Sequence, residues 1–230
     1  MKTINIQFSI LNRQASIDNN HLSIFNIQSK AGFTLLELLV VIVIIMFLAG
    51  ITLPIVSSVQ TSAKKGVTSA QISQLELALK QFESDFGKFP PDSYTTSETD
   101  DISFGTVSIP HDDNLDTGSK CLVFFLGSIF IFNPGLSNEE TYGPYIEFKR
   151  SQITGTGVDF ADDTGSLTFT GVNGTREVFQ YKDPFGSPYL FDSSYDSPPP
   201  NNRASFDIWS RGPDKADNSG ADASDDITNW

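Results

Sequence analysis

Cysteine and histidine are nearly absent from this chain of 230 residues, which has one cysteine and two histidines. The single cysteine, Cys121, cannot form a disulfide within the chain. It lies in an apolar run, where we expect a small buried side chain. The sequence also lacks the Gly-x-Ser-x-Gly, His-Glu-x-x-His and phosphate-loop motifs that carry hydrolytic or phosphoryl chemistry. These absences disfavour an enzyme.

Two acidic clusters contain residue types that occur in catalytic or metal sites, but their sequence context does not indicate such a site. Asp162 and Asp163 could serve a glycosidase only beside a sugar-binding groove, and nothing in the sequence indicates one. His111-Asp112-Asp113 offers three possible metal ligands, but adjacent residues rarely converge on one ion, and no second histidine or cysteine lies nearby. We interpret this second cluster as a solvated loop.

Basic residues are also scarce, because 15 lysines and arginines face 28 acidic residues, for a net charge of −13. Phosphate backbones would be repelled, so nucleic acid is not an expected partner. The first 32 residues are the exception, and their charged members are Lys2, Arg13, Asp18 and Lys30. Basic residues ahead of a membrane span favour a cytoplasmic N-terminus, although Lys64 and Lys65 after the apolar run weaken this asymmetry.

Charge is almost missing between Ala31 and Ala63, where Glu37 is the single charged residue. The segment Leu38–Val56 is uncharged and nearly all apolar, and as a helix it would extend ~28 Å, close to the hydrocarbon thickness of a bilayer. A secretory signal would be shorter and would end in a small-residue cleavage site. The sequence therefore predicts one membrane span. Glu37 at its start is costly, by ~2.5–3.5 kcal/mol at a helix centre, so it either has a partner or reaches the membrane surface.

Residues 30–37, Lys-Ala-Gly-Phe-Thr-Leu-Leu-Glu, resemble the class III signal of type IV pilins and type II secretion pseudopilins. In that family a prepilin peptidase cuts after the glycine, here between Gly32 and Phe33, and the new N-terminal residue is N-methylated. The resemblance implies that Glu37 neutralises the N-terminal amine of Phe33 in a neighbouring subunit of a fibre. The two charges cost less as a pair than singly in lipid.

A second helical segment continues the apolar run. Gly50 and Pro54 are tolerated in membrane helices, and we expect a kink at Pro54, whose position also resembles the family. Gly87 and then Pro90-Pro91 should end the helix. We expect one helix from about Thr34 to Phe86. Its water-exposed half carries an apolar stripe at 3-4 spacing, made of Ile72, Leu75, Leu79, Phe82 and Phe86. The stripe covers too few heptads for us to prefer a coiled coil.

Residues 88–230 have the composition of a folded head. We expect residues 88–120 and 135–143 to be mostly loop, and residues 145–150 to form a short strand or a helical turn. The apolar run 121–132 is too short for a second span, so we predict a buried helix over about Gly118–Leu126, packed on the apolar stripe. Short β-type segments separated by Gly, Asp and Pro then predict antiparallel strands at Leu167–Thr170, Val178–Tyr181, Pro188–Phe191 and Phe206–Trp209.

Residues 183–189, Asp-Pro-Phe-Gly-Ser-Pro-Tyr, resemble a turn of the major pseudopilin, with Phe185 at the tryptophan position. The turn needs no ligand, because proline fixes one backbone angle and glycine supplies a positive φ. The predicted fold is α+β: a long N-terminal helix, half transmembrane and half amphipathic, packed on a small antiparallel sheet, as in pilins.

The C-terminus is rich in aspartate and has two possible interpretations. It could be a disordered acidic tail, but its last residues, Ile227-Thr228-Asn229-Trp230, favour anchoring. Clustered carboxylates with glycines between them also suit calcium, although the spacing does not fit an EF-hand. Residues 206–214 and 226–230 resemble the calcium loop that ends the major pseudopilin.

That resemblance implies a calcium ligand set of Arg211, Asp214, Ala216, Asp225 and Asp226, with Arg211 and Ala216 supplying backbone carbonyls. The loop departs from the family pattern at three positions: Pro213 replaces alanine, Lys215 replaces glycine, and Ser224 stands where aspartate is common. Asp217 or Asp222 could substitute. The alternative is a metal-free loop.

The resemblance implies three regions: a cytoplasmic leader over residues 1–32 that is cleaved, a transmembrane and stalk helix over 33–87, and a pilin-like head over 88–230. It implies a structural subunit of a type II secretion pseudopilus, anchored once in the inner membrane with its head in the periplasm. Its partners would be prepilin peptidase, further copies, minor pseudopilins, the inner-membrane assembly platform and lipid. The alternatives are a type IV or minor pilin for adhesion, motility or DNA uptake, and a membrane-anchored binding module.

Overall fold

The computed structural model describes residues 32–159, 167–195, 197–218 and 225–230. The chain divides into two compact units, Met1–Ala49 and Gly50–Trp230, which we describe separately. The leader, the pair Asp162-Asp163 and residues 219–224 lie outside the described residues, and so does the prediction of a cleaved N-terminal leader.

One long helix, α1 (Leu35–Phe86), opens the described chain, which confirms the predicted limits. It stops at Gly87, whose φ of 74° only glycine adopts without strain. The Gly87 N–H donates to the carbonyl oxygen of Glu83 at 2.7 Å and so closes the last turn. The helix is continuous through Pro54, and the kink there stays a prediction.

In the second unit, the predicted apolar stripe of α1 is buried under the head. Leu75, Leu79 and Phe82 have no exposed area. The predicted buried helix is also present as α2 (Gly118–Gly127). The Phe125 ring of α2 meets the Phe82 ring edge-on, with centroids 5.8 Å apart, so the two helices share one aromatic core.

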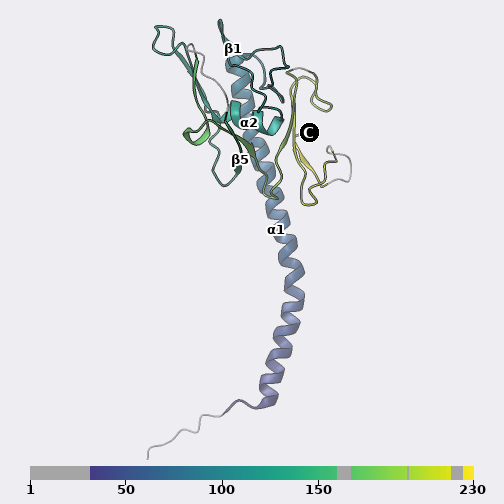
Figure 1. The fold of residues 1–230 in the computed structure, drawn as a ribbon. Helices are drawn as coiled ribbons and strands as arrows, with labels where there is room; N and C mark the ends of the chain where they lie inside the picture. Colours follow the sequence, from purple (N-terminus) through teal and green to yellow (C-terminus); the bar gives the residue numbers. More distant parts are fainter. Residues whose placement is uncertain (1–31, 160–166, 196, 219–224) are drawn as a thin grey trace, which may run out of the picture. The chain divides into compact units, whose positions relative to one another are not determined.

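Antiparallel strands surround these helices. Figure 1 shows two of the sheets on either side of α1, one in teal and green and the other in yellow. The first has the order β4 (Glu140–Tyr142), β3 (Ile129–Phe132), β6 (Leu167–Thr170), and the second has the order β10 (Ile227–Thr228), β9 (Phe206–Ser210), β8 (Leu190–Ser193). Two further pairs are β1 (Ser103–Phe104) with β2 (Val107–Ser108), and β5 (Ile153–Asp159) with β7 (Glu177–Tyr181). A short 3₁₀ turn, η1 (Val172–Gly174), precedes β7. The α+β fold class is therefore confirmed.

Some local predictions were incomplete or wrong. The segments expected to be mostly loop are so, but they also contain the short strands β1, β2 and β4, and the apolar run after α2 continues as β3. Residues 145–150 form neither strand nor helix. Strand β5 had no predicted counterpart, and β8 begins two residues later than expected because Pro188 makes only an isolated bridge with Lys182. Strands of two or three residues are too short to carry a periodic pattern, so the sequence does not reveal them.

Candidate functional site

The predicted assembly residue Glu37 is part of a reciprocal cap at the start of α1. Its Oε2 accepts hydrogen bonds from the Thr34 N–H at 2.8 Å and from the Thr34 hydroxyl at 2.9 Å. In return, the Glu37 N–H donates to the Thr34 hydroxyl oxygen at 3.2 Å. This is a capping box, which the Thr-x-x-Glu spacing could have predicted and which our sequence analysis missed. The cap fixes where the carboxylate stands on the first turn.

The predicted processing site precedes this cap. Phe33 is 80% exposed, and Gly32 is exposed beside it. A Cβ added at Gly32 would meet no atom within 4 Å, so the described fold itself does not require glycine there. The prediction that an enzyme reads this glycine is compatible with that finding and is not tested by it.

The first unit presents apolar side chains on all sides of the helix. Between Phe33 and Leu48, each large apolar side chain is at least 39% exposed. The helix α1 is long and apolar enough to cross a membrane. These side chains therefore need an apolar environment that the described residues of this single chain do not supply.

In the second unit, α1 carries a further apolar stripe that the head leaves uncovered. Val59, Val67 and Leu77 are 61%, 52% and 62% exposed. We name this the outer stripe, and its members are Val56, Val59, Ala63, Val67, Ala70 and Leu77. Their 3-4 spacing places them on one helical face, apart from the face buried under the head. The two faces explain why α1 is more apolar than a helix that packs on one side only.

The C-terminus is anchored to the head and does not form a loose acidic tail. Strand β10 pairs with β9 at Ile227↔Ser210 and Thr228↔Trp209. The Asn229 side chain accepts from the Ile208 N–H at 2.9 Å and donates to the Phe206 carbonyl at 3.2 Å. The anchoring expected from the last four residues is thus confirmed.

The predicted calcium residues lie in the loop between β9 and β10. Oδ2 of Asp225 accepts from the Asp214 N–H at 3.1 Å, and Oδ2 of Asp226 accepts from the Asn218 N–H at 3.1 Å. A side chain at Gly212, whose φ is 63°, would overlap the Asp225 carbonyl oxygen. The two ends of the loop are therefore in direct contact.

The fit of this loop to a metal ion is partial. Among the described residues, Oδ1 of Asp225 is buried without a hydrogen-bond partner, which suits a cation ligand. Asp214 turns its Oδ1 to the N–H of Ala216 at 2.8 Å, and Asp217 pairs with Arg211 at 3.7 Å. Among the described residues there is no group of three or more acidic, histidine or cysteine side chains that could hold a metal. Asp222 lies outside them, so the calcium site stays a prediction.

The side chains of the histidine cluster go to separate partners. His111 stacks on Tyr94 with ring centroids 4.1 Å apart. Oδ1 of Asp112 accepts from the Asn114 N–H at 2.7 Å, and Oδ1 of Asp113 accepts from the Thr96 hydroxyl at 2.6 Å. The Thr96 bonds also lower the pKa of the Asp113 carboxyl. The three residues thus serve local turns.

The turn at residues 183–189 is organised by Asp183, which our sequence analysis did not single out. Its Oδ1 accepts from the N–H groups of Phe185 and Ser187, both at 2.9 Å, and its Oδ2 accepts from the Ser210 hydroxyl at 2.6 Å. The side chain is buried, so these bonds replace its hydration. The turn thereby fixes β9 and leads into Tyr189, whose hydroxyl donates to Gln71 of α1 at 2.8 Å.

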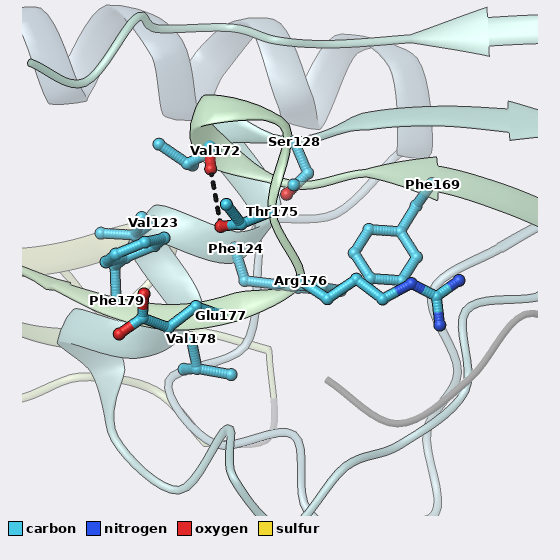
Figure 2. A pocket seen from close by; sticks show the side chains of 11 residues that line it. Val123, Phe124, Ser128, Phe169, Val172, Thr175, Arg176, Glu177, Val178 and Phe179 are labelled. Atoms are coloured by element: carbon cyan, nitrogen blue, oxygen red, sulfur yellow. Dashed lines mark hydrogen bonds between the residues drawn. The ribbon is translucent and has the colours of Figure 1, made fainter. Parts of the chain in front are cut away.

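Figure 2 shows a small pocket lined by side chains of α2, β6 and β7. Its volume is about 10 Å³, which is roughly the space of one water molecule. Apolar side chains dominate its lining, and the Thr175 hydroxyl donates to the Val172 carbonyl at 3.2 Å. This pocket is too small for a substrate.

Comparison with known proteins identifies one similarity. Residues 27–53 match a family model described as the prokaryotic N-terminal methylation motif. This range contains Gly32, Phe33 and Glu37. No curated protein and no solved structure matches the chain significantly. The match supports a type IV pilin-like protein, anchored by its apolar N-terminal helix and built for fibre assembly, and it implies processing by prepilin peptidase.

Proposed function

We propose that this protein is a structural subunit of a type II secretion pseudopilus, without enzymatic activity of its own. Prepilin peptidase cuts between Gly32 and Phe33, Phe33 is N-methylated, and the mature chain polymerises through α1. The observation that carries this proposal is the apolar surface of α1, which is exposed in the first unit and continues along the outer stripe in the second.

Membrane lipid covers the apolar surface of the first unit before assembly. The outer stripe includes Val67 and Leu77, which follow the predicted span at Leu38–Val56 by ten residues or more. Burying a valine or leucine side chain contributes roughly 1.5–3 kcal/mol relative to leaving it in water. Helices of neighbouring copies supply such a cover, and the stripe therefore favours polymerisation over a solitary anchored module.

The N-terminal charges give this assembly its register. Cleavage creates an amine at Phe33, and Glu37 of a neighbouring copy is its counter-charge. Both groups are costly in lipid when alone and less costly as a pair. The Thr34–Glu37 cap holds the carboxylate on the first helical turn, where an incoming amine would meet it.

Four sequence features favour a pseudopilus over a pilus of adhesion, motility or DNA uptake. The turn at residues 183–189 and the ends of the C-terminal loop resemble those of the major pseudopilin. A single cysteine excludes the internal disulfide loop of many pilins, and the anionic head disfavours DNA. In this proposal the head faces the periplasm, and the fibre contains further copies and minor pseudopilins on an inner-membrane platform.

Calcium at the C-terminal loop is a separate part of the proposal. Asp214, Asp225 and Asp226 would hold the ion by carboxylates, and Arg211 and Ala216 by backbone carbonyls. Calcium would supply a positively charged partner for the buried Oδ1 of Asp225. The residues themselves already bring Asp225 to the Asp214 N–H, so the ion would strengthen an existing loop closure.

Production of the full chain in a bacterium that lacks its own major pseudopilin tests the proposed function. We expect mass spectrometry to find an N-methylated N-terminal Phe33, and we expect fibres together with restored protein secretion. Fibres that give surface motility or DNA uptake without secretion would support the pilus alternative. A methylated chain that remains monomeric beside a working assembly platform would contradict polymerisation altogether.

A further inference from the structure

Two aspartates stand directly opposite each other in the sheet β10-β9-β8. Asp192 of β8 and Asp207 of β9 are register partners, flanked by the pairs Phe191↔Ile208 and Ser193↔Phe206. Side chains of such partners lie on the same face of a sheet, where two like charges are destabilising. A pair of this kind needs a compensating arrangement.

Both carboxylate oxygens of Asp207 accept hydrogen bonds from the chain. It is 1% exposed. Its Oδ2 accepts from the N–H and the side-chain amide of Asn201 at 2.9 and 3.0 Å, and its Oδ1 accepts from the Asn202 N–H at 2.9 Å. These three donors fix the Asp207 carboxyl in place opposite Asp192.

A third carboxyl comes from the segment that follows α1. Oδ2 of Asp92 accepts from the Ser193 N–H at 3.1 Å, across 101 positions of the sequence. This bond places the Asp92 carboxyl beside Asp192. Partial burial, the hydrogen bond with Asp92 and the charges of Asp92 and Asp207 together raise the pKa of Asp192 to about 6.

The charged and titratable groups packed around this site do not relieve the repulsion. Cys121 of α2 is close enough to Asp92 to feel its charge, but burial raises the pKa of this thiol well above its usual value, so the thiol is neutral. Lys88 lies in the same segment as Asp92, and it donates to the Tyr195 hydroxyl at 3.2 Å, with its ammonium 4.3 Å from the centre of the tyrosine ring. A proton is then the simplest positive charge available to the aspartates.

We propose that Asp92 and Asp192 form a proton-dependent latch that joins the segment after α1 to the β8–β9 hairpin. When the two carboxyls share a proton, an O–H···O⁻ hydrogen bond links the segments. When that proton leaves, this bond is lost and the carboxylates repel one another, so that the Asp92–Ser193 hydrogen bond is left to join the segments against that repulsion. This inference concerns the stability of the head and is independent of whether the protein builds pseudopili.

The direction of the pH effect follows from the raised pKa. The unfolded chain releases the Asp192 proton near its ordinary value of ~4, whereas the folded chain retains it to about 6. Between these two values, stability falls as the pH rises, and above the second value the loss is complete. The head is therefore held more tightly in mildly acidic surroundings than at neutral pH.

Thermal melting of the full chain in detergent micelles tests the latch at about pH 5 and about pH 7.5. We expect the wild type to melt higher at the acidic pH. Asp192→Asn should raise the melting temperature at neutral pH and reduce the difference between the two conditions. Glu147→Gln removes one exposed negative charge elsewhere and should leave that difference unchanged.

Carbon-detected NMR titration of the aspartate carboxyls provides a second measurement that does not depend on a variant folding. We expect Asp192 to titrate near 6 in the wild type and at a lower pH in Asp92→Asn, because that change removes a neighbouring negative charge. Titration of Asp192 at its ordinary value, or an unchanged pH dependence of melting in Asp192→Asn, would overturn the latch.

Discussion

The backbone N–H of Asp214 donates a 3.1 Å hydrogen bond to Oδ2 of Asp225, which joins the two ends of the loop between β9 and β10. The other oxygen of Asp225 is buried and has no hydrogen-bond partner in the part of the chain that the structure describes. This hydrogen bond brings Asp214 and Asp225 together without an ion. Under the calcium proposal, an ion would strengthen that closure.

The calcium proposal predicts a metal-dependent melting temperature for the full chain in detergent. Added calcium should raise it relative to EDTA, by the equivalent of ~2.7 kcal/mol at a hundredfold excess over the dissociation constant. Asp225→Asn should abolish the shift, while Asp113→Asn, at an exposed aspartate of another loop, should retain it. Equal melting temperatures of the wild type in calcium and in EDTA would rule out the site.

Substitutions at Glu37 separate its two roles. Glu37→Gln keeps an oxygen that can accept the Thr34 hydrogen bonds, whereas Glu37→Ala removes the cap and the charge together. If pairing with a neighbouring amine drives assembly, both variants should lose fibres, because leaving one member of a buried pair costs ~3–5 kcal/mol. Quantified fibre yield is the measurement, with Glu76→Gln on the same helix as the control. Normal assembly of Glu37→Gln would show that the cap alone suffices.

Substitutions of a leucine in the outer stripe and of a leucine in the buried stripe should differ in their effects on stability and on assembly. Leu77 is 62% exposed and Leu79 is fully buried. Leu77→Ser should change the free energy of unfolding of the single chain by less than ~0.5 kcal/mol and should weaken assembly. Leu79→Ala should destabilise the chain by ~3 kcal/mol through the cavity that it leaves. Undiminished fibre yield with Leu77→Ser would argue against the outer stripe as an interface.

Lys215 occupies a backbone conformation that suits glycine. Its φ is 62°, in the left-handed region, where a side chain costs ~1–2 kcal/mol. We expect Lys215→Gly to raise the free energy of unfolding by ~1 kcal/mol, after allowance for the larger entropy of glycine in the unfolded chain. Lys215→Ala keeps a Cβ in the same conformation and should give no gain. Chemical denaturation of the three proteins compares them, and equal stabilities would show that the loop relaxes around the lysine.

Asp183 should be the most sensitive residue of the turn at 183–189. Asp183→Ala removes an acceptor for three hydrogen bonds, two from the backbone and one from Ser210, at a net cost of ~1 kcal/mol each. Asp183→Asn retains one carbonyl oxygen and should lose less. Denaturant melts of both variants test this order, and a smaller loss in Asp183→Ala than in Asp183→Asn would contradict it.

The features that the sequence predicted well depend on local patterns. Unbroken apolarity defines α1, its 3-4 stripe defines the buried face, and Gly87 defines its end. Strands β6, β7 and β9 were placed within one residue at each end because they alternate or are apolar and are bounded by turn residues. Such signals need no knowledge of distant partners.

The features that escaped prediction depend on contacts between distant residues. Strand β4 contains Glu140 and Thr141, which pair with Phe132 and Ile131 of β3 and are too few to give a strand signal of their own. The meeting of Asp92 with Ser193 likewise spans 101 positions. The Thr34–Glu37 cap is different, since its Thr-x-x-Glu spacing is a local signal from which a capping box could have been predicted. At the C-terminal loop, the sequence suggested the ligand types but not that Asp214 would direct its carboxylate to Ala216.

Cys121 has a practical consequence for mapping contacts between copies. It is completely buried, and burial holds the pKa of its thiol well above its usual value, so it presents almost no thiolate to reagents. A cysteine introduced on the surface would then be the one reactive thiol of the chain. Disulfide trapping between residues such as Leu77→Cys in adjacent subunits could thus be performed without first removing the native cysteine, and each bond formed would report a single pair of positions.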